Sequence, residues 1–221
     1  VVIYAAFQIP FMIISALVLA LVLDSFLVRR AGFFRLTYFL PFAIPGIVAA
    51  MVWLYIYTPE LSPIVKFFDS LGLHINFMAP GAPILASMAN MTTWTYTGYN
   101  MLIFLAALQA IPHELYEAAR LDGASSWQIV RRIKIPMVSS AALLAVLLSI
   151  IGTIQLFNEP AVMYSSNRWM GNAYTPMMMA YSTMMTSPGN PNMASAISMT
   201  MAIIAALLAA VYAFVQTRGK R

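Results

Sequence analysis

Long apolar stretches alternate with shorter polar connections along the chain. Five uncharged stretches have the length that a bilayer-spanning helix needs, which is roughly 20 apolar residues. They are residues 1–23, 37–57, 84–108, 138–158 and 193–215. The pattern predicts an all-α fold: a polytopic transmembrane helix bundle with about five visible spans, forming a single domain over residues 1–221.

The N-terminal end is apolar from Val1 and carries no initiating Met. We therefore expect the natural N-terminus and one earlier span to precede Val1, and we assign no signal or targeting segment to this end.

Three connections or interruptions have distinctive compositions. Pro41 and the pair Pro45-Gly46 fall within the second stretch and predict a bend or a local loosening of that span. Residues 64–71 predict a short amphipathic helix lying on the membrane surface. Residues 159–192 are rich in Asn, Pro, Gly, Ser and Met, which predicts an irregular lid.

Composition agrees with a membrane protein. The chain is 62% hydrophobic and only 9% charged, so it has too little polar surface to close a water-soluble globule. It contains no Cys, which excludes a disulfide-stapled domain and any cysteine-based catalyst or metal centre within these residues. The net charge of +5 is explained by membrane topology, with no need for nucleic acid as a partner.

The basic residues indicate the orientation. Five spans place alternate connections on opposite sides, and the side richer in Lys and Arg is cytoplasmic. One side holds Arg29, Arg30, Arg35, Arg120, Arg131, Arg132, Lys134, Arg218, Lys220 and Arg221. The other side holds only Lys66 and Arg168. We therefore place the C-terminus and the connection at residues 109–137 in the cytoplasm.

The connection at residues 109–137 has strong helix signals. Residues 113–122 predict a helix with acidic side chains in its first turn, and Gly123 supplies the left-handed residue that ends it. Ser125 and Gln128 predict a capping box that opens a second short helix, which we expect Pro136 to terminate.

One face of the first of these helices combines small and charged residues: Leu115, Ala118, Ala119 and Asp122 share the face, with Glu117 and Arg120 beside it. Alanines let another protein approach closely, and charges at the edge fix the register. A charged loop of this kind is also often a solvated face that folds against its own bundle. The residues alone leave both interpretations open.

The run from Glu117 to Ala124 reads Glu-Ala-Ala-Arg-Leu-Asp-Gly-Ala, and an Ile-Lys-Ile-Pro segment ends at Pro136. This pattern resembles the EAA loop of ABC-transporter permease subunits. Its position, with two spans following, is similar to the sugar-importer branch of maltose and glycerol-phosphate permeases. The resemblance implies a non-enzymatic permease of the bacterial or archaeal plasma (inner) membrane that forms half of a carbohydrate pathway.

In that family the EAA helix is a cytoplasmic coupling helix that sits in a cleft of the ATPase. The resemblance therefore implies that coupling rests on Glu117, Ala118, Ala119, Asp122, Gly123 and Pro136. It also implies three protein partners: a second homologous permease, an ATP-binding cassette ATPase dimer that binds ATP and Mg, and an extracytoplasmic solute-binding protein. This chain itself is expected to hold no cofactor and no metal.

Polar residues within the spans are the candidates for substrate contact. They are Asn90, Thr93, Trp94, Tyr96, Thr97, Tyr99 and Asn100 in the third span, and Gln155 and Asn158 near the end of the fourth. Hydroxyl and amide groups beside aromatic rings suit a neutral polyol. Hydrogen bonding between helices uses the same residue types, so that alternative remains open.

Charge within the spans bears on the cargo. Gly152, Gln155 and Glu159 are expected to share one helical face, with Glu159 at the outer water boundary. The spans contain no basic residue, which favours a neutral sugar over glycerol phosphate. The alternatives are a permease for glycerol phosphate or another small polar solute, and a stand-alone ion-coupled carrier or channel, which commonly places an ionisable residue at midplane.

Overall fold

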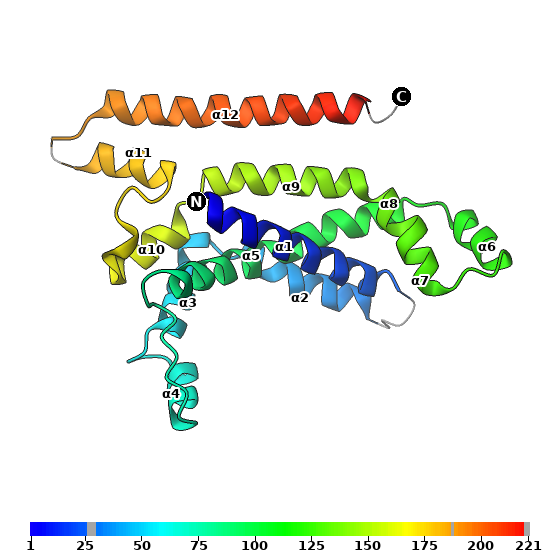
Figure 1. The fold of residues 1–221 in the computed structure, drawn as a ribbon, viewed down its shortest axis with the longest axis horizontal. Helices are drawn as coiled ribbons and strands as arrows, with labels where there is room; N and C mark the ends of the chain where they lie inside the picture. Colours follow the sequence, from blue (N-terminus) through cyan, green and yellow to red (C-terminus); the bar gives the residue numbers. More distant parts are fainter. Residues whose placement is uncertain (26–29, 187, 219–221) are drawn as a thin grey trace.

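The computed structural model describes residues 1–25, 30–186 and 188–218, and every regular element within them is helical (Figure 1). The all-α helix bundle expected from the hydrophobic pattern is confirmed. Three of the basic residues used for the orientation, Arg29, Lys220 and Arg221, lie outside the described residues.

The centre of the bundle is built from α1 (Val2–Leu23), α5 (Ala82–Gln109) and α9 (Ser139–Ile154), which run alongside one another (Figure 1). Ala16 and Ala20 on α1 are fully buried, and so is Phe104 on α5. Small side chains on one helix let a large ring from the next approach closely, which is how helices gain packing energy where no water is available to be expelled. The apolar stretches at 1–23 and 84–108 thus correspond to α1 and α5.

The second apolar stretch is two helices. α2 (Ala31–Ala43) and α3 (Gly46–Tyr57) meet at an angle of 94°. Ile44 between them is extended because it precedes Pro45, whose ring disfavours a helical conformation at the residue before it. The predicted bend is confirmed, and it is a full break at a right angle.

Close approach of α2 to α5 depends on Gly98. A Cβ at that position would overlap the backbone carbonyl of Tyr38, so only glycine allows the two helices to cross there.

The predicted cytoplasmic connection forms α6 (His113–Leu121), α7 (Ser126–Ile129), a π-helical segment η1 (Val130–Lys134) and α8 (Ile135–Met137). Gly123 has a φ of +81° and ends the first helix as predicted. The capping box of Ser125 and Gln128 is present.

The second helix ends at Met137, one residue after Pro136, and the chain bends by 57° before α9. Pro136 itself lies within the last helical turn. In a regular α-helix the proline ring would collide with the carbonyl four residues earlier. The wider π-helical turn immediately before it lets the chain pass through this position while remaining helical.

The fourth span is shorter than predicted. α9 ends at Ile154, residues 155–157 are not helical, and α10 (Asn158–Ser166) begins a new direction. Gln155 and Glu159 therefore do not share a helical face with Gly152. The following connection is also more regular than the predicted irregular lid, because it contains α10, a 3-10 turn η2 (Arg168–Met170) and α11 (Pro176–Met185).

The remaining helices are α4 (Pro63–Ser70) and α12 (Pro191–Arg218). α4 matches the predicted amphipathic helix, and its placement on a membrane surface stays a prediction. α12 packs on α9 and α11 and is otherwise largely exposed.

Among the described residues, length and composition qualify α1 and α12 as membrane spans. The pair α2–α3 and the bent helix at 126–154 can each count as one more. α5 has the length of a span, but its polar side chains make it less apolar.

Candidate functional site

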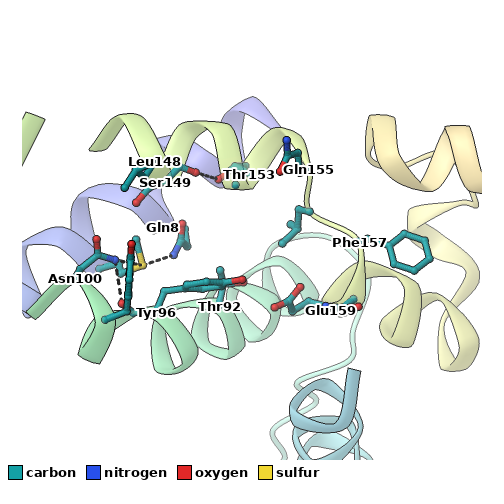
Figure 2. Close-up of a pocket in the computed structure, with 15 residues that line it drawn as sticks. Gln8, Thr92, Tyr96, Asn100, Leu148, Ser149, Thr153, Gln155, Phe157 and Glu159 are labelled. Carbon is teal, nitrogen blue, oxygen red and sulfur yellow. Dashed lines mark hydrogen bonds between the residues drawn. The ribbon is translucent and has the colours of Figure 1, made fainter. Parts of the chain in front are cut away.

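A pocket of about 250 Å³ lies between α1, α5 and the junction of α9 with α10 (Figure 2). Its wall is mostly hydroxyl, amide and aromatic. The lining residues are Gln8 and Met12 from α1; Thr92, Tyr96, Tyr99 and Asn100 from α5; Leu148, Ser149, Gly152 and Thr153 from α9; and Gln155, Leu156, Phe157, Asn158 and Glu159.

Five of the nine residues predicted for the substrate pathway line this pocket: Tyr96, Tyr99, Asn100, Gln155 and Asn158. Tyr99 stacks on Phe42 of α2, with ring centroids 4.7 Å apart, which fixes the orientation of its ring. Asn100 is buried and donates from Nδ2 to the backbone oxygen of Tyr96 at 2.9 Å.

The other four predicted residues do not line the pocket. Asn90 donates from Nδ2 to the hydroxyl of Tyr57 at 2.7 Å, and Trp94 packs edge to face on Trp53. Thr97 donates its hydroxyl hydrogen to the backbone oxygen of Thr93 at 2.6 Å, one turn back on α5. Asn90 and Trp94 thus contact α3, which is the interhelical alternative left open by the sequence.

Several pocket residues were not singled out from the sequence. Gln8 is 3% exposed and lies inside an apolar span, so its polarity was a signal that could have found it. Its amide contacts the sulfur of Met12 at 3.3 Å. Thr92 accepts a hydrogen bond of 2.6 Å from the hydroxyl of Tyr4, which joins α1 to α5 at the edge of the pocket.

Glu159 lies inside the molecule, which corrects its expected place at the outer water boundary. The residue is 6% exposed. The non-helical residues after Ile154 turn α10 back against α3 and α5, and this turn carries the first residues of α10 inward. Figure 2 shows the carboxylate of Glu159 directed toward Tyr96 and Thr92.

The second candidate surface is the helical hairpin α6–α7, which projects from one end of the bundle (Figure 1). Most of the predicted coupling residues are exposed on it: Glu117, Ala118, Asp122 and Gly123, with Ala119 half-buried and Pro136 exposed nearby. Two large apolar side chains are also exposed on the hairpin, Leu121 at 89% and Trp127 at 67%. Sequence reasoning did not single out either of these residues.

The base of the hairpin is attached to the bundle by Lys134. Its Nζ lies 2.6 Å from Oδ2 of Asp24 at the C-terminal end of α1, and both side chains are about 15% exposed. The same Nζ lies 5.4 Å from the ring centroid of Tyr116 on α6. Burial, together with the charge of Asp24, raises the pKa of the Tyr116 hydroxyl. Lys134 therefore connects α1, α6 and the π-helical segment.

The pocket thus lies inside a bundle that contains broken spans, and the charged hairpin lies at one end of that bundle. The family model described as "Binding-protein-dependent transport system inner membrane component" matches residues 13–220, and the chain belongs to this family. It is accordingly a multi-pass protein of the inner membrane.

Individual relatives agree with the family. The chain is 33% identical over 166 residues to a probable ABC transporter permease, YurN, of Bacillus subtilis; the match covers 73% of this chain and 57% of the relative. It is 35% identical over 162 residues to the lactose transport system permease LacF of Rhizobium radiobacter, covering 72% and 54%. The chain thus spans about half the length of the curated relatives it matches.

The fold is also similar to a solved one. A bacterial ABC transporter involved in the import of the acidic polysaccharide alginate matches with a TM-score of 0.79 and 17% identity, over 98% of this chain and 76% of that chain.

Proposed function

We propose that this chain forms one half of the transmembrane pathway of an ABC importer for a carbohydrate and couples to a separate ATPase through α6. The hairpin α6–α7 carries the proposal. It exposes Leu121 and Trp127 to solvent while Lys134 and Tyr116 hold its base against the bundle. Exposed apolar side chains rimmed by charge favour a protein partner over a freely solvated loop.

A carbohydrate cargo is supported by the pocket wall. Sugar hydroxyls need hydrogen-bond partners, and sugar C–H faces pack on aromatic rings. Thr153 and Ser149 offer hydroxyl oxygens, Asn158 and Gln155 offer amides, and Tyr96 offers a ring. Relatives named for lactose and for xylose/arabinose point in the same direction.

The proposal includes three protein partners. A pocket of about 250 Å³ within one chain does not enclose a whole path for a hydrophilic solute, so a second homologous permease is expected to complete it. An ATP-binding cassette ATPase dimer binds ATP and Mg and docks on α6. A solute-binding protein delivers the carbohydrate at the outer face, as supported by a fold neighbour solved with a pentasaccharide-bound periplasmic protein.

Two other functions draw on specific observations. Relatives named for sn-glycerol-3-phosphate support a permease for that solute. The buried carboxylate of Glu159 is the kind of group that an ion-coupled carrier or channel uses, so it supports the stand-alone alternative. Solute uptake driven by an ion gradient in vesicles without ATP would favour that carrier over the importer.

The importer proposal is tested with the full-length protein expressed with its co-purifying subunits. We expect ATP-dependent sugar uptake in vesicles, and we expect Glu117→Lys to abolish uptake and the stimulation of ATPase activity while the protein remains inserted. Glu60→Lys is the matched control, because Glu60 is an exposed acid between α3 and α4, remote from the hairpin. Normal coupling in Glu117→Lys, or full activity of the chain alone, refutes the proposal.

A further inference from the structure

The pocket carries a single carboxylate with no compensating cation. Among the described residues that line the pocket, none is Lys, Arg or His. Glu159 is nevertheless buried, and its carboxylate accepts a hydrogen bond from its own backbone amide. Buried carboxylates in proteins are usually paired with a cation or hydrogen-bonded several times. The two oxygens of this carboxylate can accept further hydrogen bonds, so it can also bind a solute that enters the pocket.

The fold holds this carboxylate in place. Glu159 lies in the first turn of α10, where the partial positive charge of the helix end favours an anionic side chain. α10 packs against both α3 and α5, so Glu159 cannot swing out to solvent without moving the helix. Tyr4 and Tyr96 are close enough to interact with it electrostatically. Figure 2 shows the side chain directed into the pocket.

We propose that Glu159 makes this pocket selective for neutral or cationic solutes over anionic ones. The identification of the cargo as a carbohydrate rests on the proposed function, and on that basis the cargo is a neutral sugar or an amino sugar. Neighbouring hydroxyls of a neutral sugar donate to a carboxylate in charge-assisted hydrogen bonds. A uronate or a sugar phosphate is repelled, because charge interacts strongly in a partly dry pocket.

The experiment measures the charge preference of the pocket without using transport. The 221 residues contain no Cys, and a Cβ added at Gly152 in the pocket wall meets no atom within 4 Å. The Gly152→Cys variant therefore places one thiol in the pocket. Its reaction rates with a cationic and an anionic methanethiosulfonate reagent of similar size are measured at pH 8, in membranes containing the full-length protein and its partner subunits.

We expect the ratio of cationic to anionic rate to exceed that of a free thiol in solution by about tenfold. Adding Glu159→Gln, which keeps the side-chain shape, returns the ratio to the solution value, whereas Glu159→Asp keeps it high. Gly32→Cys on α2 is the control, since it also has open space and does not line the pocket. We expect the ratio of cationic to anionic rate at Gly32→Cys to be unchanged by either substitution at Glu159.

The proposal is overturned if Glu159→Gln leaves the ratio at Gly152→Cys unchanged, or if neither reagent reaches the thiol. If Glu159→Gln prevents assembly, the proposal is tested with the Gly152→Cys variant alone. A ratio of cationic to anionic rate at or below the value for a free thiol in solution then overturns the proposal. Failure of carbohydrate uptake in the separate vesicle assay refutes the proposed function and leaves the charge selection standing. The two results are thus distinguishable.

Discussion

Replacing Lys134 by Met removes the positive charge that holds the base of the α6–α7 hairpin and keeps a side chain of similar length. Asp24 then loses its partner at a site where its side chain is 16% exposed. It also lies at the C-terminal end of α1, where the helix dipole disfavours negative charge. We therefore expect Lys134→Met to be more destabilising than Asp24→Asn.

The expected loss of stability for Lys134→Met lies between two limits. Removing one partner of a fully buried pair costs about 3–5 kcal/mol, and an exposed pair contributes about 0–1 kcal/mol. The Lys134–Asp24 pair is only partly accessible to water, so we expect a loss of about 2 kcal/mol for Lys134→Met. For a chain of this size that loss lowers Tm by roughly 4–8 °C.

The assay is thermal unfolding of the purified complex in detergent. The fraction that stays folded after heating is measured by size-exclusion chromatography with detection of intrinsic fluorescence. The double variant Lys134→Met with Asp24→Asn completes a thermodynamic cycle. We expect it to be more stable than Lys134→Met alone, because no uncompensated charge is left. Two outcomes would refute this account of the Lys134–Asp24 pair. One is a Tm for Lys134→Met within about 1 °C of wild type, which is on the order of the measurement error. The other is strictly additive effects of the two substitutions in the cycle.

Two further substitutions, each with a matched control, test other features of the fold and the hairpin. Gly98→Ala should destabilise the bundle by about 1–3 kcal/mol in the unfolding assay, because the added Cβ overlaps the Tyr38 carbonyl. Gly152→Ala is the control, and it should leave the stability nearly unchanged because its helical position has open space. Gly123→Ala should strain a residue with φ of +81° by about 1 kcal/mol and lower the uptake achieved per ATP hydrolysed. Gly72→Ala carries the same backbone strain at φ +76°, outside the hairpin, so uptake per ATP should remain normal; equal losses in both variants contradict a coupling role for Gly123.

Local signals in the sequence located several elements well. The apolar run at 1–23 and the predicted helix at 113–122 match α1 and α6 within a residue or so. These ends are set by local chemistry, such as the φ of +81° at Gly123. Five of the fifteen residues that line the pocket were likewise visible as polar residues inside apolar stretches.

The break after Ile154 was not predicted, because the non-helical residues 155–157 themselves contain neither Pro nor Gly. The structure supplies a long-range reason. Ending the helix frees the carbonyl of Leu156, and the hydroxyl of Thr175 donates to it at 2.6 Å. Both residues are buried, and they are 19 positions apart. A hydrogen bond of this kind between distant residues leaves no periodic signal, so Glu159 was assigned to a continuous helix and to the wrong environment.

The π-helical segment before Pro136 has a consequence for how the chain tolerates changes of length. A π-helical turn holds one more residue than an α-helical turn and returns the chain to nearly the same direction. Deleting one residue from Val130–Lys134 would therefore convert the wide turn to an ordinary one and leave Leu121 and Trp127 facing nearly the same way relative to α9. Pro136 would then follow a regular helical turn, whose carbonyl its ring would meet. We therefore expect the extra residue to matter for accommodating Pro136 more than for the direction of the hairpin.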